Sequence, residues 1–210
     1  METKGPKSSV KVGLLAVQGA FAEHEAMLDR LGVPWVELRQ ADDLRREFDA
    51  LILPGGESTV QAKLLDELGM RDPLVSFIRE GMPVLGTCAG AILLAQRVSH
   101  GSGSGDFCRK TPRGLATMPI CIVRNAYGRQ SGSFRTEGIF TLDGFSSEPQ
   151  TLPMTFVRAP VIAQADDGVE VLARVNGDIV GVRYGNQMAL SFHPELDNDT
   201  TVHNAFLSLV

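Results

Sequence analysis

The pentapeptide Gly86-Thr87-Cys88-Ala89-Gly90 contains the side chain best suited to act as a nucleophile. It follows the apolar run 82–85 and precedes the helix-forming run 91–95, so we expect a buried strand to turn sharply into a helix at Cys88. At such a turn the side chain is exposed above the sheet, and the dipole and free N–H groups of the helix start favour thiolate over thiol. The spacing is the cysteine form of the G-x-S-x-G nucleophile elbow. The alternative is a small core residue, since cysteine is often buried for packing alone.

A candidate base and its carboxylate partner lie near the C-terminus, in His193-Pro194-Glu195, after the strand-like segment 188–192. Proline biases the residue before it toward extended backbone, where side chains two apart face the same side. We therefore expect Glu195 to accept the ring N–H of His193, which leaves the other ring nitrogen for Cys88. A single histidine at a strand end is more often a surface or packed residue, but its combination with the cysteine turn favours a triad.

The segment Pro54-Gly55-Gly56-Glu57-Ser58 also follows a strand and opens a helix, so it should lie at the same edge of the sheet as Cys88. Two adjacent glycines permit unusual backbone angles and close approach of a substrate. The N–H groups of Gly56 and Ala89 are the expected donors for the negative charge that develops on a reacting carbonyl oxygen. An ordinary glycine turn or a phosphate loop is the alternative, although the lysine of a phosphate loop is absent.

Two arginines, Arg124 and Arg158, lie at the ends of strand-like segments. Each alone fits a solvated surface residue. Together they could bind the α-carboxylate of an amino-acid substrate, because guanidinium is the preferred partner of a carboxylate.

The elements that position these residues follow from the hydrophobic pattern. In the first half, short apolar strands alternate with amphipathic helices, which predicts a mostly parallel sheet covered on both faces. The second half has several strand-like runs with few helices between them, and Asn176-Gly177 is a strong hairpin signal, so we expect an added antiparallel portion. The predicted strands are 10–17, 35–38, 50–53, 82–85, 118–123, 138–142, 154–157, 169–174, 178–184 and 188–192. The predicted helices are 20–31, 60–68, 73–81 with Asp72 as its N-cap, 91–95 and 200–210.

Length and composition restrict the class of protein. The 210 residues suffice for one sizeable domain, expected at 10–210 after a disordered or extended tail at 1–9. A net charge of −5 without a basic run argues against binding to nucleic acid or to an anionic membrane surface. The tail has no apolar segment typical of a signal peptide, and no apolar run has membrane-spanning length, so we expect a cytoplasmic protein.

Several of these motifs resemble the class I, triad-type glutamine amidotransferases, and more narrowly the glutaminase subunit of the two-component pyridoxal 5′-phosphate synthase. The resemblance covers nearly the whole chain in order, whereas the segment from about 100 to 113, with Cys108, is longer than is usual in that family. The matching segments are Gln18-Gly19-Ala20, 54–59, 86–90, 124–130, 156–160 and 191–196.

The resemblance implies a class I glutamine amidotransferase-like α/β fold and hydrolysis of L-glutamine to L-glutamate and ammonia by Cys88, His193 and Glu195 through a glutamyl thioester. It implies that ammonia passes to a (β/α)₈ synthase subunit that makes pyridoxal 5′-phosphate. No cofactor or metal is expected for the hydrolysis itself. From its place in the family-like segment, Gln18 is the candidate contact for activation by the partner. The implied glutamine-binding residues are Gly55, Gly56, Glu57, Ser58, Arg124, Val157 and Arg158.

Two other functions stay open at this stage. One is a γ-glutamyl hydrolase, or a glutaminase that serves another synthase, which ammonia release from free glutamine and from γ-glutamyl peptides would separate. The other is a catalytically silent regulatory subunit with the same fold, which would have no need to retain Cys88, His193 and Glu195.

Overall fold

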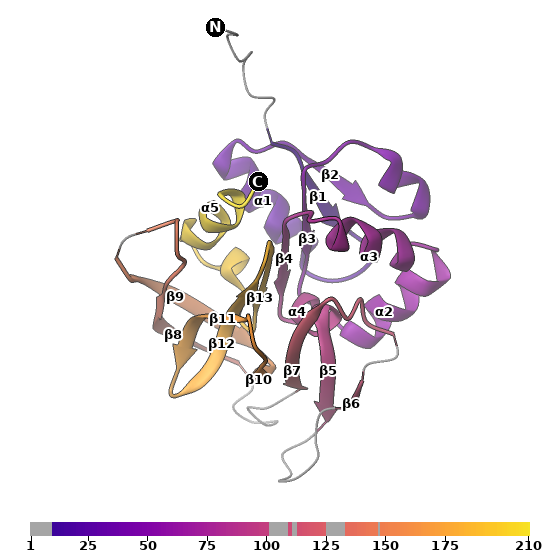
Figure 1. Cartoon of the computed structure of the whole chain (residues 1–210). Coiled ribbons are helices and arrows are strands. Elements are labelled where there is room, and N and C mark those ends of the chain that lie inside the picture. The colour runs from indigo at the N-terminus through magenta and orange to yellow at the C-terminus, as the bar shows by residue number, and fades with distance from the viewer. Residues whose placement is uncertain (1–9, 101–108, 111–112, 125–132, 147) are drawn as a thin grey trace, which may run out of the picture.

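The computed structural model describes residues 10–100, 109–110, 113–124, 133–146 and 148–210 (Figure 1). The predicted tail at 1–9, Cys108, most of the 100–113 segment and residues 125–130 lie outside these described residues. In the first half, strands and helices alternate as predicted. The elements are β1 (Val12–Leu15), α1 (Phe21–Leu31), β2 (Trp35–Leu38), the 3₁₀ helix η1 (Ala41–Arg45), β3 (Ala50–Leu53), α2 (Ser58–Glu67), α3 (Arg71–Arg79), β4 (Val84–Thr87) and α4 (Ala89–Leu94).

The second half contains most of the remaining strands and the last helix. Those elements are β5 (Ala95–His100), β6 (Arg109–Lys110), β7 (Met118–Arg124), β8 (Ser133–Phe140), β9 (Gln150–Val157), β10 (Val161–Ala165), β11 (Glu170–Val175), β12 (Asp178–Tyr184), β13 (Gln187–Leu190), the 3₁₀ helix η2 (Pro194–Leu196) and α5 (Thr201–Leu207). Strands β5, β6 and β10 were not predicted from the sequence, and β13 ends two residues before the predicted strand does.

The centre of the sheet is parallel, in the order β2-β1-β3-β4-β13. Every residue of β1, β3, β4 and β13 is buried, which is typical of parallel strands that are covered on both faces. Because parallel strands place their carboxyl ends at one edge, the segments after β3, β4 and β13 meet there. This edge is where the chain places the glycine loop, Cys88 and His193.

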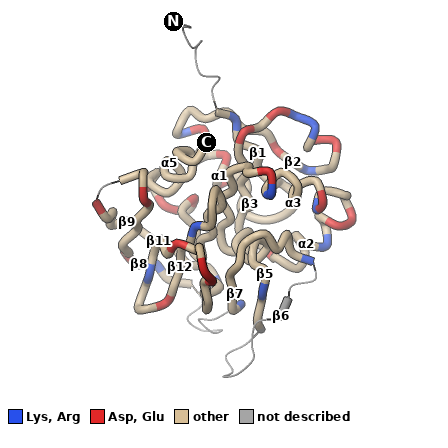
Figure 2. Tube along the Cα trace, viewed as in Figure 1, with Lys and Arg blue, Asp and Glu red and all other residues tan. Residues whose placement is uncertain are grey.

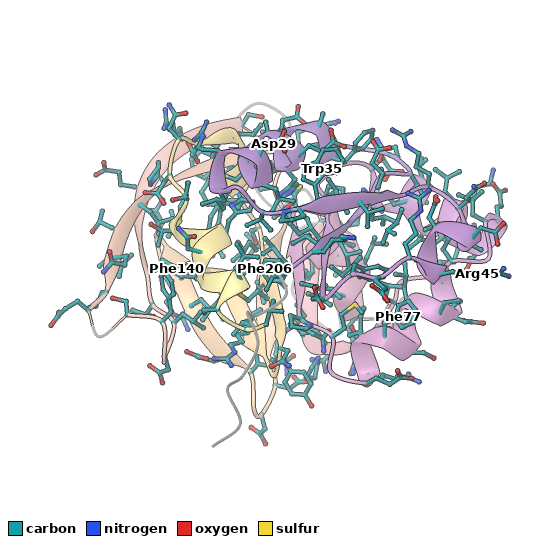
Figure 3. All side chains as sticks on the ribbon, turned by 90° about the horizontal axis from the view of Figure 1, so that it is seen from above. Asp29, Trp35, Arg45, Phe77, Phe140 and Phe206 are labelled. Atoms are coloured by element: carbon teal, nitrogen blue, oxygen red, sulfur yellow. The ribbon has the colours of Figure 1, made fainter. Side chains whose placement is uncertain are left out.

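Successive side chains of β3 point to opposite faces of the sheet and show which elements cover each face. Leu51 and Leu53 belong to a core cluster that includes residues of α2, α3 and α4. Ala50 and Ile52 belong to a second cluster, with residues of α1, α5 and strands β8, β9 and β11. Figures 1 and 3 show α1 and α5 across the sheet from α2 and α3, with Phe206 of α5 beside the strands.

The antiparallel portion extends the sheet beyond β13 through β12, β10 and β7. The predicted hairpin at Asn176-Gly177 is confirmed, because Val175 pairs with Asp178 and the two turn residues have φ of 52° and 91°. Strand β8 pairs with β9 along its whole length, from Ser133 opposite Val157 to Phe140 opposite Gln150. This pairing sets the end of β9, with Val157, near the edge that holds Cys88.

Acidic and basic positions are mixed over the outer loops and helices (Figure 2). Among the described residues, no helix combines the length and apolar character that crossing a membrane requires.

Candidate active site

Cys88 lies between β4 and α4 in a backbone conformation that side chains rarely adopt, with φ 48° and ψ −99°. Such a residue costs about 1–3 kcal/mol and persists only where its surroundings impose it. Here the Cys88 N–H donates to the carbonyl of Leu190 at 2.8 Å, and its own carbonyl accepts from Ile92 at 3.2 Å. The thiol is free and 7% exposed. The predicted sharp turn at Cys88 is present.

The flanking glycines allow this turn to pack tightly. A Cβ on Gly90 would overlap the backbone carbonyl of Leu53 in β3, and a Cβ on Gly86 would lie 2.8 Å from the carbonyl carbon of Gly90. Both glycines are therefore needed for α4 to approach β3 and β4. The G-x-C-x-G pattern thus reflects packing below Cys88 as well as the turn itself.

His193 reaches the same edge because β13 pairs in parallel with β4, with Leu190 opposite Thr87. Its N–H donates to the carbonyl of Thr155 at 2.8 Å, and its Nδ1 lies 2.6 Å from Glu195 Oε1. The prediction that the two side chains meet is confirmed. Its premise of extended backbone is wrong: His193 has φ −111° and ψ 87°, outside the extended region, and Glu195 lies in η2, where Pro194 opens a 3₁₀ turn that brings the carboxylate back.

His193 and Glu195 each favour the charged form of the other. Burial lowers the pKa of His193, but hydrogen bonds to Cys88 and Glu195 outweigh burial and raise this pKa to about 10. Burial raises the pKa of Glu195, but His24 and the bond from His193 outweigh it and hold the carboxyl below its ordinary value. The site therefore favours a protonated imidazole between Cys88 and a carboxylate, which is the arrangement that activates a cysteine.

The glycine loop lies directly against the base. A Cβ on Gly55 would overlap the imidazole of His193, so only glycine allows this approach. The Gly55 carbonyl accepts the N–H of Ala20 at 2.9 Å, and Gln18 Oε1 accepts the N–H of Glu57 at 2.9 Å. The segment 18–20 therefore holds the loop in its present orientation.

Glu57 and Arg124 close one side of this loop. The Glu57 carboxylate caps α2 by accepting the N–H groups of Thr59 and Val60, at 3.2 and 2.8 Å. Arg124 donates to Glu57 Oε1 at 2.8 Å and to Thr59 Oγ1 at 3.0 Å. Burial raises the pKa of Glu57, but the backbone and Thr59 bonds, with Arg124, lower it overall. Arg124 thus contacts the loop, with its guanidinium on Glu57.

The other predicted substrate residues lie at the end of β9 and the start of α2. The thiol of Cys88 is directed at the carbonyl oxygen of Val157, 3.9 Å away. Arg158 follows with a φ of 45° and is exposed. Ser58 is the first residue of α2 and is 5% exposed. The structure brings Val157 to Cys88 and Arg124 to Glu57, and it provides no contact that joins the two arginines among the described residues.

Sequence reasoning missed a buried polar cluster behind Glu195, formed by His24 of α1, Thr87 of β4 and His203 of α5. One signal was present, since His24 shares the buried face of α1 with Met27 and Leu28. A histidine three and four positions from core residues must find polar partners inside the protein. Within the described part of the chain, no group of three or more His, Cys, Asp or Glu side chains is arranged to hold a metal ion.

Comparison with solved structures defines the class. A crystal structure of a glutamine amidotransferase matches with a TM-score of 0.82 and 40% identity, covering 94% of this chain and 97% of that one. PurLQS from Thermotoga maritima matches with a TM-score of 0.66 over 96% and 98% of the two chains, and at 19% identity it shows the fold alone. The fold is that of a class I glutamine amidotransferase.

Comparison with known sequences narrows this class. The pyridoxal 5′-phosphate synthase subunit PdxT of Desulfitobacterium hafniense (strain Y51) is 52% identical over 201 residues, 96% of this chain and 94% of that protein. The subunit of the same name from Methanocorpusculum labreanum is 50% identical over 201 residues, 96% and 98% of the two chains. Residues 14–210 match the SNO glutamine amidotransferase family, and the chain belongs to that family.

Proposed function

We propose that this chain is the glutaminase subunit of a pyridoxal 5′-phosphate synthase and hydrolyses L-glutamine to L-glutamate and ammonia. The observation that carries the proposal is the strained Cys88 at the end of β4, at the same sheet edge as a His193 whose ring Glu195 holds at 2.6 Å. Support for the pathway comes from relatives at 50–52% identity that are named pyridoxal 5′-phosphate synthase subunit PdxT.

In the first half of the proposed reaction, the Cys88 thiolate attacks the side-chain amide carbon of glutamine. His193, protonated and oriented by Glu195, transfers its proton to the leaving nitrogen as the C–N bond breaks. Ammonia departs and a glutamyl thioester remains on Cys88. In the second half, neutral His193 takes a proton from water, whose oxygen attacks the thioester. The C–S bond breaks, glutamate leaves, and Cys88 with His193 returns to its starting state.

The N–H groups of Gly56 and Ala89 are the proposed donors to the oxyanion in both halves. Ala89 begins α4 directly after the nucleophile, and Gly56 belongs to the loop that touches His193. Removing one such donor costs roughly 10²–10³-fold in turnover. The Gly55 carbonyl is held by Ala20, and a peptide flip at Gly55-Gly56 would have to break that bond.

The glutamine side chain and its α-carboxylate need separate contacts. We assign them to the loop after β3, to the end of β9, which contacts Cys88 through Val157, and to the end of β7, which contacts the loop through Arg124. Arg158 is the stronger candidate for the α-carboxylate, because it is exposed whereas Arg124 already pairs with Glu57. The proposed glutamine-binding residues are Gly55, Gly56, Glu57, Ser58, Arg124, Val157 and Arg158.

The proposed partner is a (β/α)₈ synthase subunit that receives the ammonia in the cytoplasm. Gln18 is the proposed activation contact. Its side chain accepts the N–H of Glu57, and its carbonyl accepts from Gln61 at 2.9 Å. A partner that contacts Gln18 would therefore act on the glycine loop through existing hydrogen bonds, and it would favour the loop conformation that it binds best.

The test is an assay of ammonia and glutamate with free L-glutamine, in the presence and absence of the cognate synthase subunit. We expect stimulation by the synthase, loss of ammonia release in Cys88→Ala and Cys88→Ser, and retained activity in the surface control Lys63→Ala. Release of ammonia from γ-glutamyl peptides in preference to glutamine would indicate a γ-glutamyl hydrolase. A wild-type chain that binds the synthase but releases no ammonia would indicate a silent subunit.

A further inference from the structure

Glu195 has two carboxylate oxygens in different surroundings. Oε1 receives the bond from His193 at 2.6 Å. Oε2 is buried, and the described residues give it no hydrogen bond that meets strict geometry. Its polar neighbour is His24 of α1, whose Nε2 lies 3.5 Å away with both side chains fully buried. A buried carboxylate oxygen without a donor is costly, so the state of His24 matters for Glu195.

His24 belongs to a small network that joins three parts of the fold. Its Nε2 also lies 3.3 Å from Thr87 Oγ1, one residue before Cys88. Its Nδ1 lies 3.1 Å from Nε2 of His203 in α5. The second ring nitrogen of His203, Nδ1, is buried and has no partner among the described residues.

The network has one arrangement of protons that satisfies every N–H group. Burial lowers the pKa of His24, and burial together with His24 lowers that of His203 to about 3, so each ring holds one proton at neutral pH. If the single ring proton of His24 is on Nε2, this N–H points toward Thr87 and Glu195. The bare Nδ1 of His24 then accepts the Nε2–H of His203. The opposite arrangement would turn a lone pair of His24 toward the carboxylate and leave a buried N–H on His203 without an acceptor.

We propose that His24 is a positioning residue for the triad, which presents its Nε2–H to Glu195 Oε2 and thereby holds the carboxylate that orients His193. His203 fixes the His24 tautomer by donating to Nδ1. The proposal rests on the proposed function, since it extends the same triad, and it adds α1 and α5 to the elements that control the base.

Two substitutions of His24 separate its two nitrogens. In His24→Gln the amide nitrogen falls near the position of Nε2 and can still donate to Glu195. In His24→Asn the amide falls near Nδ1, which preserves only the side facing His203. We expect His24→Asn to lower kcat for glutamine hydrolysis by about 10-fold or more with little change in KM, and His24→Gln to stay within about threefold of wild type.

A double-mutant cycle tests whether His24 acts through Glu195. In a Glu195→Gln background, the carboxylate that His24 would hold is gone, so adding His24→Asn should change kcat by less than about twofold. Equal losses in His24→Gln and His24→Asn, or losses that multiply with that of Glu195→Gln, would assign His24 to packing and overturn the proposal. Measurements of Tm on each variant identify losses that come from unfolding.

The wild-type chain supplies a test that needs neither activity nor a stable variant. The ring ¹⁵N chemical shifts of His24, in protein labelled with ¹⁵N-histidine, distinguish the two neutral tautomers. We expect the Nε2–H tautomer for His24, with bare Nδ1. The Nδ1–H tautomer would refute the proposal. Failure of the proposed function would look different, as absence of glutamine hydrolysis by the wild type together with its synthase.

Discussion

Gly55 and the imidazole of His193 are packed so closely that a Cβ on residue 55 would overlap the ring. The loop that is proposed to supply an oxyanion donor is therefore in contact with the proposed base. Because Ala20 and Gln18 hold the same loop through hydrogen bonds, a shift in the segment 18–20 would reach both the oxyanion donor and the imidazole.

Gly55→Ala should lower glutamine turnover by about 100-fold or more, because the added Cβ displaces the His193 ring from Cys88. The matched control is Gly32→Ala, which has open space around it but a φ of 66°. That control should cost about 1 kcal/mol of stability and leave kcat unchanged. Steady-state kinetics and urea unfolding of both variants check the prediction. Wild-type turnover in Gly55→Ala would show that the ring has room to move.

Both Glu195→Gln and His193→Ala should reduce kcat, and the fold-reduction in Glu195→Gln should be about 10 to 100 times smaller than that in His193→Ala. The reason is that the carboxylate orients and stabilises the ring while His193 itself moves the protons. Single-turnover and steady-state rates at saturating glutamine give the comparison. An equal or larger loss in Glu195→Gln would assign proton transfer to the carboxylate.

Arg158→Ala should raise KM for glutamine by about 10-fold or more with kcat nearly unchanged, because a carboxylate contact stabilises the bound substrate and the transition state alike. Arg174→Ala, an exposed arginine on β11, is the control. An unchanged KM in Arg158→Ala would move the assignment to Arg124, whose bond to Glu57 would then have to rearrange when glutamine binds.

Gln18→Ala should weaken stimulation by the synthase more than it weakens basal hydrolysis, because Gln18 joins the outer segment 18–20 to the N–H of Glu57. The measurement is glutamine turnover during a titration with the synthase subunit. If basal and stimulated rates fall by the same factor, Gln18 supports the loop but does not transmit contact with the partner.

Acidification should destabilise the protein through its buried histidines. The pKa of His203 falls from 6.5 to about 3 on folding, so the unfolded chain binds the extra proton between these values. The contribution of neutral His203 to the free energy of unfolding is therefore complete above about pH 6.5 and is lost progressively as the pH falls toward 3. For one proton, the free energy of unfolding changes with a slope of about 1.4 kcal/mol per pH unit in this range. His203→Gln should reduce that slope in denaturant unfolding at pH 4.5 to 7. Identical slopes would mean that His203 is protonated in the folded chain.

Local patterns were enough to predict the parallel sheet and the meeting of His193 with Glu195 at the edge that holds Cys88. Cys88 and His193 each follow a short buried strand, and pairing of those strands in parallel brings both to one edge without further information. The hairpin at Asn176-Gly177 was equally local, since positive φ at both positions favours that dipeptide.

Long-range contacts were not predictable in the same way. His24 and His203 are 179 positions apart, and no local pattern marks them as partners. Strand β5 was missed because the apolar run 91–95 continues the helical pattern, whereas tertiary pairing with β7 ends the helix at Leu94. The pairing of Arg124 with Glu57 depends on the approach of β7 to α2, which the sequence does not encode as a motif.

Covalent labelling with a glutamine analogue that carries an electrophilic carbon in place of the side-chain amide tests the central claim most directly. Intact-mass and peptide mass spectrometry should find one adduct, on Cys88, whose rate of formation matches the loss of glutaminase activity and falls sharply in His193→Ala. Loss of activity with Cys88 unmodified would contradict the assignment of Cys88 as the nucleophile.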